Sequence, residues 1–434
     1  MSLRSPAITS FSILLLSCGF SILCSAQGLP PGPNARGKQL QENIGTPSPG
    51  DWQQLVKLVS SAGNPTFFFG NSAGISGDTV VISASPGDLS AIAGWVFVKS
   101  AQGWANTVPV GGLKLPGSIV FMTYAAIDGD TVVIGAPSLD PGSPSYAYVF
   151  VKPATGWTNM TPTAVLTPSD SMDGYFGESI SVRGDTIAVG DPGFESSPGS
   201  VYVYTKPAGG WANMTQTAKL TASDGMINDN LGQSVSVHGT TIAAGAPQNE
   251  EYDLAGKAYV FVQPAGGWTS MTQTAELTVP AAPEGSDIGT SIYANDSWVL
   301  AGAPSFGNSG FSGSAYIFSK PASGWANTTA TAMLTPGDPR PDSEFGWSVS
   351  GSGNIAVVGA PRRGAPPFEI EGGVYVFKEP ASGWQNMTGL TVLTGSDARS
   401  DAWLGESVAM SGNVVVTGEQ NPYTTGAAYV FGLP

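Results

Sequence analysis

The sequence predicts an all-β protein, a seven-bladed β-propeller built from four-stranded antiparallel blades. Its main support is one segment that recurs seven times. The copies open at Phe69-Gly70, Phe121-Met122, Phe176-Gly177, Leu231-Gly232, Ile288-Gly289, Phe345-Gly346 and Leu404-Gly405. A Gly-Trp pair closes six copies, at a spacing of roughly 52 to 59 residues, which is the size of a propeller blade. Abundant Gly, Ser, Thr and Val favour short strands and tight turns over helices.

The seventh closing segment is missing after Phe431 and is found at the other end of the repeats. Asp51-Trp52, followed by QQLVKL, has the form of the GWANMTQTAKL segment that closes an internal copy. A linear stack of repeats would not need this split. In a closed ring the N-terminal strand completes the last blade and leaves no open sheet edge, so we expect that closure here.

The chain begins with the pattern of a secretory signal peptide. Residues 1–26 carry one charge at Arg4, an apolar run too short to span a bilayer, and small residues before a cleavage position near Ala26. Both cysteines, Cys18 and Cys24, lie inside this segment, so the mature protein is expected to have no disulfide. We expect a secreted, extracellular or periplasmic protein. A lipoprotein with Cys18 as the lipidated residue is the less favoured alternative.

The rest of the chain divides into a linker and one large repeat domain. Residues 27–50 are rich in Pro, Gly and Asn without an apolar period, which is typical of a flexible leader. Residues 51–434 hold the seven copies and are expected to form the propeller. They contain no further hydrophobic span, so we expect no membrane-spanning segment.

Each copy reads as four strands. In the third copy these are residues 178–182, 186–190, 200–205 and 215–220. The first two are joined by Arg183-Gly184-Asp185, a tight hairpin corner. The third, SVYVYT, has the β-branched and aromatic residues that suit a sheet.

The charge of the chain excludes some partners. A formal net charge of −15 with only 17 scattered basic residues argues against binding to nucleic acid or anionic membranes. The expected partners are therefore an extracellular protein or a glycan. The oligomeric state is not predicted.

The motifs resemble those of a known family. Phe-Gly opens a strand, Gly-Ala-Pro ends the next, and Gly-x-Val-Tyr-Val-Phe follows, which resembles the FG-GAP repeats of the integrin alpha-subunit head and of secreted bacterial proteins. The Gly-Ala-Pro segments start at Gly135, Gly245, Gly302 and Gly359. Other copies depart from the motif, with Ser83-Ala84-Ser85, Gly190-Asp191-Pro192, Gly418-Glu419-Gln420 and Phe121-Met122.

Integrin blades carry calcium in the loop between the first two strands, which the resemblance would place at the hairpin corners here. These corners hold only two or three residues and cannot wrap an ion. A weaker acidic pattern lies between blades, where calcium and turn capping are alternative interpretations. The paired carboxylates are Asp170 with Asp173, Asp224 with Asp229, Asp338 with Asp342, and Asp397 with Asp401. No other cofactor is predicted.

Catalytic motifs are absent from the sequence, and we expect a binding protein rather than an enzyme. His238, the only histidine, occupies a hairpin corner, which we expect to offer no enclosure for catalysis. The Arg183-Gly184-Asp185 tripeptide occupies the preceding corner and is attributed to chance variation of a turn.

The recurring tryptophans allow two interpretations. They either pack as core residues at a fixed position of each blade or form a ring of sugar-stacking platforms. The equivalent residues are Trp52, Trp104, Trp157, Trp211, Trp268, Trp325 and Trp384.

The loops between second and third strands vary most and supply the candidate ligand-binding residues. Their aromatic and arginine side chains are of the kind that dominates binding energies. They are Tyr252, Phe306, Phe311, Arg362, Arg363 and Phe368. These loops predict a recognition or adhesion module that binds a protein or cell-surface ligand. The alternatives are a carbohydrate-binding or carbohydrate-active propeller and a structural envelope component.

Overall fold

The computed structural model describes most of the chain after Asp51. The described residues are 52–60, 68–85, 92–105, 108–116, 122–138, 143–170, 175–193, 197–247, 255–305, 310–364, 370–389, 391–397, 399–420 and 425–433. The predicted signal peptide and linker lie outside them. All regular elements of the described residues are strands, and none of these residues forms a helix long and apolar enough to cross a membrane.

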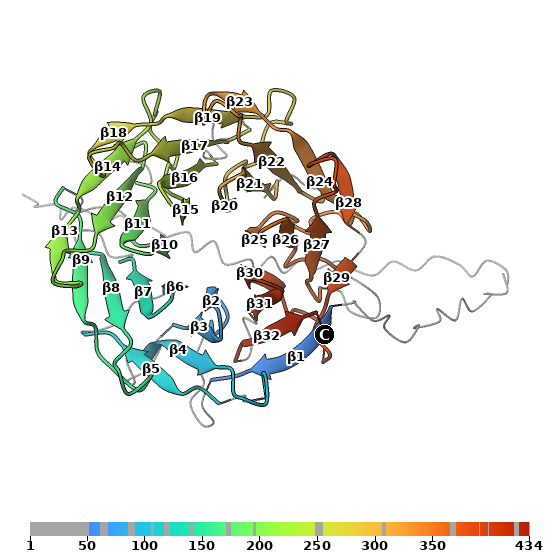
Figure 1. Cartoon of the computed structure of the whole chain (residues 1–434). Helices are drawn as coiled ribbons and strands as arrows, with labels where there is room; N and C mark the ends of the chain where they lie inside the picture. Colours follow the sequence, from blue (N-terminus) through green and yellow to red (C-terminus); the bar gives the residue numbers. More distant parts are fainter. Residues whose placement is uncertain are drawn as a thin grey trace, which may run out of the picture. The chain divides into compact units, whose positions relative to one another are not determined.

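The described strands form seven small sheets arranged in a ring, which confirms the predicted seven-bladed propeller (Figure 1). The innermost strands are β2 (Ala73–Ser76), β6 (Tyr124–Asp128), β10 (Ser179–Arg183), β15 (Ser234–His238), β20 (Ile292–Ala294), β25 (Ser348–Ser352) and β30 (Leu404–Ser411). The second strands are β3 (Thr79–Ser83), β7 (Thr131–Ala136), β11 (Thr186–Asp191), β16 (Thr241–Ala246), β21 (Trp298–Ala303), β26 (Ile355–Gly359) and β31 (Val414–Glu419).

The outer half of each blade holds two further strands. The third strands are β4 (Ile92–Val98), β8 (Tyr146–Val151), β12 (Ser200–Thr205), β17 (Lys257–Val262), β22 (Ser314–Ser319), β27 (Val374–Lys378) and β32 (Ala427–Gly432). The fourth strands are β5 (Gly111–Lys114), β9 (Ala164–Thr167), β14 (Ala218–Thr221), β19 (Ala275–Thr278), β24 (Ala332–Pro336), β29 (Thr391–Leu393) and β1 (Gln53–Leu58). Blades 1 to 7 are numbered here in the order of their innermost strands.

Strand β1 closes the ring as the sequence predicts. It pairs antiparallel with β32, with Lys57 opposite Tyr429 and Leu58 opposite Ala428. Blade 7 therefore takes three strands from the end of the chain and its outer strand from the start of the described residues. The two chain segments are held by an antiparallel ladder with one irregularity between Gln54 and Val56, so both sides of β32 are paired.

The predicted fourth strand, residues 215–220, is divided in the structure. Residues Ala218–Thr221 form β14, while Met214–Thr215 form β13, which pairs in parallel with β9 of the preceding blade. The side-chain oxygen of Asn213 also accepts a hydrogen bond from Val165 N at 2.8 Å. The other two-to-three-residue strands of this kind are β18 (Met271–Thr272), β23 (Thr328–Thr329) and β28 (Met387–Gly389). The links before the fourth strands thus cover the outer edges of neighbouring blades.

Apolar side chains from adjacent blades form the core between them. In β12 the first five of six residues are buried, because neighbouring blades cover both faces of the strand. The apolar residue that opens a blade is also buried there in the six blades where the structure describes it, as for Phe176 and Leu231, both 0% exposed. Each of the seven core clusters joins side chains of two neighbouring blades, so no blade has a core of its own.

Two glycines of the repeat meet at most blade interfaces. The second strand of one blade carries a glycine against the opening glycine of the next, and a Cβ at Gly245 would lie 1.9 Å from the carbonyl oxygen of Gly289. Gly289 has a φ of +99°, which side chains rarely tolerate. The hydroxyl of Ser234 donates to the same carbonyl at 2.7 Å. The Phe-Gly and Gly-Ala-Pro motifs are therefore two halves of one contact between blades.

Candidate functional site

The antiparallel course of the strands sorts the connections onto two faces of the ring. The corners between first and second strands lie on one face, which we call the corner face. The loops between second and third strands and the links between blades lie on the other, which we call the loop face. In blade 3, for example, β10 and β11 meet at Arg183 and Thr186, while Asp191 pairs with Ser200 at the opposite end.

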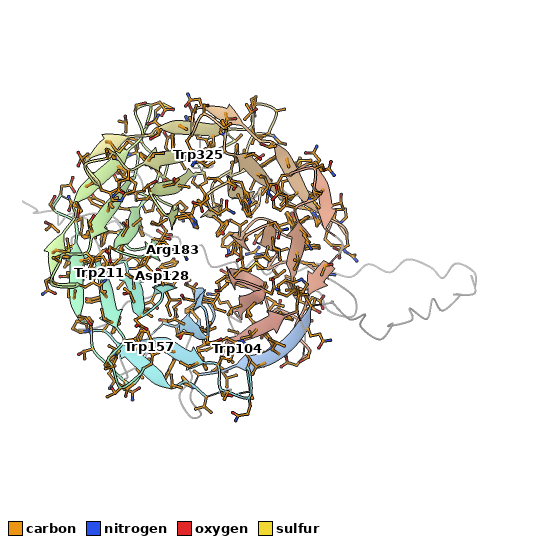
Figure 2. All side chains as sticks on the ribbon, in the orientation of Figure 1. Trp104, Asp128, Trp157, Arg183, Trp211 and Trp325 are labelled. Atoms are coloured by element: carbon orange, nitrogen blue, oxygen red, sulfur yellow. The ribbon has the colours of Figure 1, made fainter. Side chains whose placement is uncertain are left out.

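A cavity of about 570 Å³ runs along the axis and is lined by residues of all seven innermost strands. Small side chains such as Ala73, Ala126 and Ser236 line its length. Its corner-face end carries the ionisable groups Asp128, Arg183, His238 and Asp296 (see Figure 2 for Asp128 and Arg183 beside the central opening). The axis is therefore neutral along its length and charged at this mouth.

Two glutamates with altered acidity follow the opening glycines of their blades. Burial raises the pKa of Glu178 to about 7, with a further contribution from Asp191, although a hydrogen bond from Gln233 opposes the shift. Burial and the charge of Glu344 likewise raise the pKa of Glu406 to about 7. Such carboxyl groups take up and release protons near neutral pH.

Comparison with known proteins identifies the repeats. The FG-GAP repeat profile matches residues 52–98, 160–204, 214–261, 328–377 and 388–431, more than half of the chain. The chain belongs to the FG-GAP repeat family. Each match starts in or just before the outer strand of one blade and ends in the third strand of the next, so the sequence repeat is offset from the blade by one strand. Propellers of this family commonly mediate binding.

The FG-GAP propeller also matches a solved structure in fold. The WD40 β-propeller domain of Doa1 aligns with 88% of this chain and 97% of its own length, at a TM-score of 0.52 and 10% sequence identity. At that identity the likeness concerns the fold alone. No curated protein matches the chain in sequence.

The predicted binding residues are in part engaged within this FG-GAP propeller. Arg363 forms ion pairs with Asp338 and Glu371, and its side chain is only 11% exposed. Arg362 pairs with Glu344 at 3.2 Å and lies over the ring of Trp403, 5.5 Å from its centroid. Burial raises the pKa of Glu344 to about 7, and Arg362 opposes that shift only in part. Tyr252, Phe306 and Phe368 lie outside the described residues.

Phe311 is the predicted binding residue that the structure leaves accessible on the loop face. Its side chain is 46% exposed and lines a small cavity of about 130 Å³ at blade 5. Two further apolar side chains, Met226 at 59% and Ile227 at 56% exposed, stand on the link between blades 3 and 4. This pair was not predicted, although an apolar dipeptide in an otherwise polar link is visible in the sequence.

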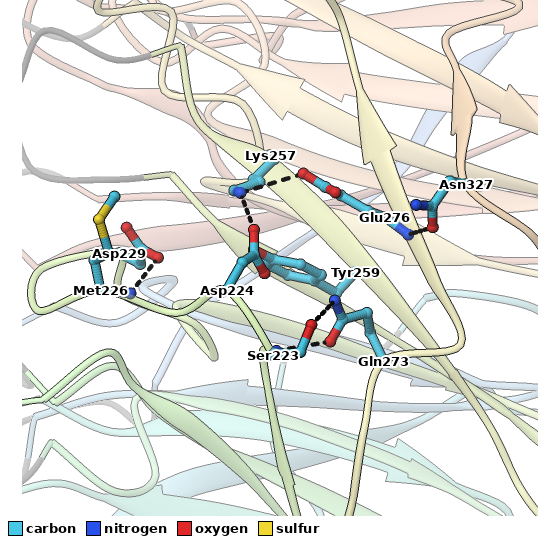
Figure 3. A network of polar contacts seen from close by, with 9 residues as sticks. All are labelled: Ser223, Asp224, Met226, Asp229, Lys257, Tyr259, Gln273, Glu276 and Asn327. Atoms are coloured by element: carbon cyan, nitrogen blue, oxygen red, sulfur yellow. Dashed lines mark hydrogen bonds and ion pairs between the residues drawn. The ribbon is translucent and has the colours of Figure 1, made fainter.

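The first aspartates of the predicted calcium pairs bind neighbouring side chains. Asp224 accepts hydrogen bonds from Tyr259 Oη at 3.0 Å and Lys257 Nζ at 2.5 Å, both on the next blade (Figure 3). Burial alone would raise the pKa of Asp224, but these hydrogen bonds outweigh it and hold the pKa below its usual value. We call such a group an aspartate clasp. The equivalent groups are Asp170 with Tyr202 and Lys219, Asp338 with Tyr375 and Arg363, and Asp397 with Tyr429 and Lys57.

The second aspartates of these pairs have separate surroundings. Asp229 accepts from the backbone N–H of Met226 at 2.8 Å, and Asp342 accepts from that of Gly310 at 3.2 Å. Asp401 has a φ of 61° within its turn, and Asp173 lies outside the described residues. Among the residues that the structure describes, no three His, Cys, Asp or Glu side chains gather closely enough to hold a metal ion. Calcium binding by these pairs stays a prediction without a described ligand set.

Six of the seven tryptophans pack in the core and Trp52 is half-buried against it, so the alternative of an accessible sugar-stacking ring is wrong. The six that close the repeats are only 6 to 8% exposed. Trp211, for example, packs in the cluster between blades 2 and 3. Those labelled in Figure 2 lie in the outer part of the ring, away from the axis. They fill the space that opens between blades as these diverge from the centre.

The hairpin corners are less isolated than the sequence suggests. His238 was expected to stand on an open tip, but its side chain is 23% exposed, and its Nε2 lies 3.4 Å from Asp296 of the next blade. Arg183 likewise lies 3.4 Å from Asp128 of the preceding blade. Sequence reasoning treated each corner alone because nothing in one repeat shows which residues the neighbouring repeat brings beside it.

Proposed function

We propose that this FG-GAP propeller is an extracellular recognition or adhesion module that binds a protein or cell-surface ligand through its loop face. The main support for this proposal is the exposure of Met226, Ile227 and Phe311 on this face. Large apolar side chains held in water by a rigid scaffold are available for burial in an interface, where such residues contribute much of the affinity.

Other features support binding over catalysis. The strands form a continuous scaffold with cores between all blades, and sequence variation gathers in the loops that it presents. Arg362, stacked on Trp403, adds a partly exposed cation to the same face. The leader, residues 1–26, supports the proposal that the ligand is met outside the cytoplasm.

The test is an array of extracellular-matrix proteins and glycans probed with the protein and three single variants. Phe311→Ser and Met226→Ser remove apolar side chains from the loop face, while Val108→Ser removes one that is 66% exposed in the link before β5, toward the corner face. We expect binding to a protein ligand that each loop-face variant weakens by about tenfold or more, with Val108→Ser unchanged.

Three results would contradict the proposal. Binding to sugars alone would favour the carbohydrate-binding alternative, and turnover of a bound glycan would favour a carbohydrate-active enzyme. An absence of binding to the whole array would favour a structural envelope component. Protein binding that Val108→Ser weakens as much as Phe311→Ser would move the interface away from the loop face.

A further inference from the structure

The corners of the propeller are joined into a belt of hydrogen bonds around the axis. At four blade interfaces the residue before a corner glycine offers its side-chain oxygen to the backbone N–H of the next blade's corner glycine. The pairs are Ser411 with Gly77 at 3.2 Å, Ser76 with Gly129 at 2.9 Å, Asp128 with Gly184 at 2.8 Å, and Ser352 with Gly412 at 3.1 Å.

Among the described residues the belt is interrupted at three interfaces, and the first of them lies between blades 3 and 4. The residue before the corner glycine is Arg183 there, and a guanidinium group has donors but no acceptor. The N–H of Gly239, on blade 4, consequently has no hydrogen-bond acceptor among the described residues. The Arg183 side chain is 55% exposed to solvent.

This interruption opens onto a shallow depression on the corner face. The depression offers about 670 Å³ and is lined by Arg183, His238, Gly239 and Asp296 among others. Three donors therefore face one space: the guanidinium of Arg183, the imidazole of His238 and the N–H of Gly239. The carboxylates Asp128, Asp185 and Asp296 also line this space, which disfavours ligands with more than one negative charge.

The interface between blades 2 and 3 shows which group such a set of donors can bind. Between blades 2 and 3 the Asp128 carboxylate accepts from the corner N–H of Gly184 at 2.8 Å and lies 3.4 Å from Arg183 Nη1. A carboxylate bound to a corner glycine beside an arginine is thus already part of the fold. Between blades 3 and 4 the corresponding donors are present, but no carboxylate of the described residues accepts from the corner N–H of Gly239.

We propose that the corner face binds a small monocarboxylate ligand at this interruption, through Gly239 N–H, Arg183 and the imidazole of His238. The ligand's carboxylate takes the place that Ser76 or Asp128 occupies at other corners. This site lies on the face opposite to the proposed recognition surface and does not depend on it. A uronic acid of a glycan and the free carboxyl end of a peptide share the required chemistry.

His238 provides a unique reporter because the chain has one histidine. The full protein, labelled with carbon-13 in histidine alone, gives one set of imidazole ring signals. We expect acetate to shift these signals along a saturable curve. Methyl phosphate at matched ionic strength is expected to produce a much weaker shift, because its second negative charge meets Asp128 and Asp296.

The variant Arg183→Ser places at this corner the residue that three other corners carry. It removes the cation and supplies an acceptor for Gly239 N–H, so we expect acetate binding to weaken by about tenfold or more with the fold retained. Lys152→Ser is the matched control, since it removes a cation that pairs with a corner aspartate, Asp130, outside this site. Arg183→Lys, which keeps the charge, is expected to retain part of the binding.

Galacturonate, a short peptide with a free carboxyl end and the same peptide amidated then distinguish the two ligand sources. Tighter binding of galacturonate assigns the site to acidic glycans. Tighter binding of the free peptide, lost on amidation, assigns it to peptide ends. The proposal is overturned if no saturable shift occurs, if Arg183→Ser binds acetate as well as the unaltered chain, or if Lys152→Ser weakens binding equally.

Discussion

The interface between blades 1 and 2 differs from the other six in how two blades approach each other. At the six, a second-strand glycine touches the carbonyl of the next blade's opening glycine, as Gly245 does with Gly289. Between blades 1 and 2, Ser83 and Met122 stand at these two positions. Both halves of the glycine contact are missing at the same interface, which indicates that neither glycine is useful without its partner.

Hydrogen bonds cross this interface in both directions. At five other interfaces a serine of the earlier blade donates to the carbonyl of the later blade's opening glycine, as Ser234 does to Gly289 O. The equivalent Ser72 of blade 1 donates instead to Ala125 O at 3.3 Å. Here Thr123 of blade 2, 1% exposed, donates back to Ala84 O at 3.0 Å and Ala93 O at 2.9 Å. The comparison shows that a propeller can join blades either through close glycine contact or through a buried hydroxyl.

The largest expected effect comes from adding one methyl group at a glycine contact. Gly245→Ala would place Cβ against the carbonyl oxygen of Gly289, so one blade must move, at a cost of about 3 kcal/mol in unfolding free energy. Ser83→Ala at the equivalent position of blade 1 loses one hydrogen bond from Ser72 N, about 1 kcal/mol. Urea unfolding measures both. Equal losses would show that the two interfaces do not differ.

A smaller effect is expected from the hydroxyl groups. Ser234→Ala removes the buried hydrogen bond to Gly289 O and should cost about 1 to 2 kcal/mol in unfolding free energy. Thr123→Val should cost a similar amount at the blade 1–2 interface, while Thr123→Ser keeps the hydroxyl and serves as the control. If Thr123→Val unfolds at the same urea concentration as the unaltered protein, the hydroxyl does not replace the glycine contact.

Blades 2 and 3 also differ in how their stability depends on pH. The residue after the opening pair is Thr123 in blade 2, whereas it is the titratable Glu178 in blade 3. Burial raises the pKa of Glu178 to about 7 from an unfolded value of 4.5. Its stabilisation is therefore complete below pH 4.5 and lost as the pH rises through 7. Glu178→Gln, the residue type of blade 4, should reduce the fall in stability between pH 5 and 8, by about 1 kcal/mol after screening by water. Thermal unfolding at several pH values tests this, and an unchanged pH profile would contradict it.

The smallest expected effect concerns the aspartate clasps, which join blades 2–3, 3–4, 5–6 and 6–7. The pKa of Asp224 is held below its usual value of 3.8 by Lys257 and Tyr259, so its stabilisation is present above pH 4 and lost at lower pH. Asp224→Asn should flatten the acid limb of the stability curve by less than about 1 kcal/mol. Asp185→Asn, at an exposed corner pair, is the control and should not reproduce the flattening.

Much of the fold could be predicted from the sequence, because the residue pattern within each repeat indicates where its strands lie. The predicted residues 200–205 are β12, and the QQLVKL segment is β1 beside β32. Residues 215–220 were predicted as one strand, because the sequence of one repeat does not show how it pairs with the preceding blade. Met214 pairs with Leu166, which lies in another copy.

The candidate site was less predictable for the same physical reason. Asp224 looked like a metal ligand because its partners, Tyr259 and Lys257, lie on the following blade and far along the chain. Arg363 looked like a binding residue, although Asp338 and Glu371 engage it. The role of Gly239 N–H depends on which residue the neighbouring corner presents. Contacts between repeats decide function here, and a single repeat does not reveal them.

Ring closure by β1 also sets the order in which the molecule can form. Gln53–Leu58 leaves the ribosome before any blade, whereas its partner Ala427–Gly432 leaves after all the others. The strand must therefore wait through nearly the whole of translation with its backbone groups unpaired, and the loop that it finally closes contains almost the entire domain. Such distant pairing is slow. We expect blades to assemble first as an open, C-shaped intermediate whose final step is the joining of its two ends.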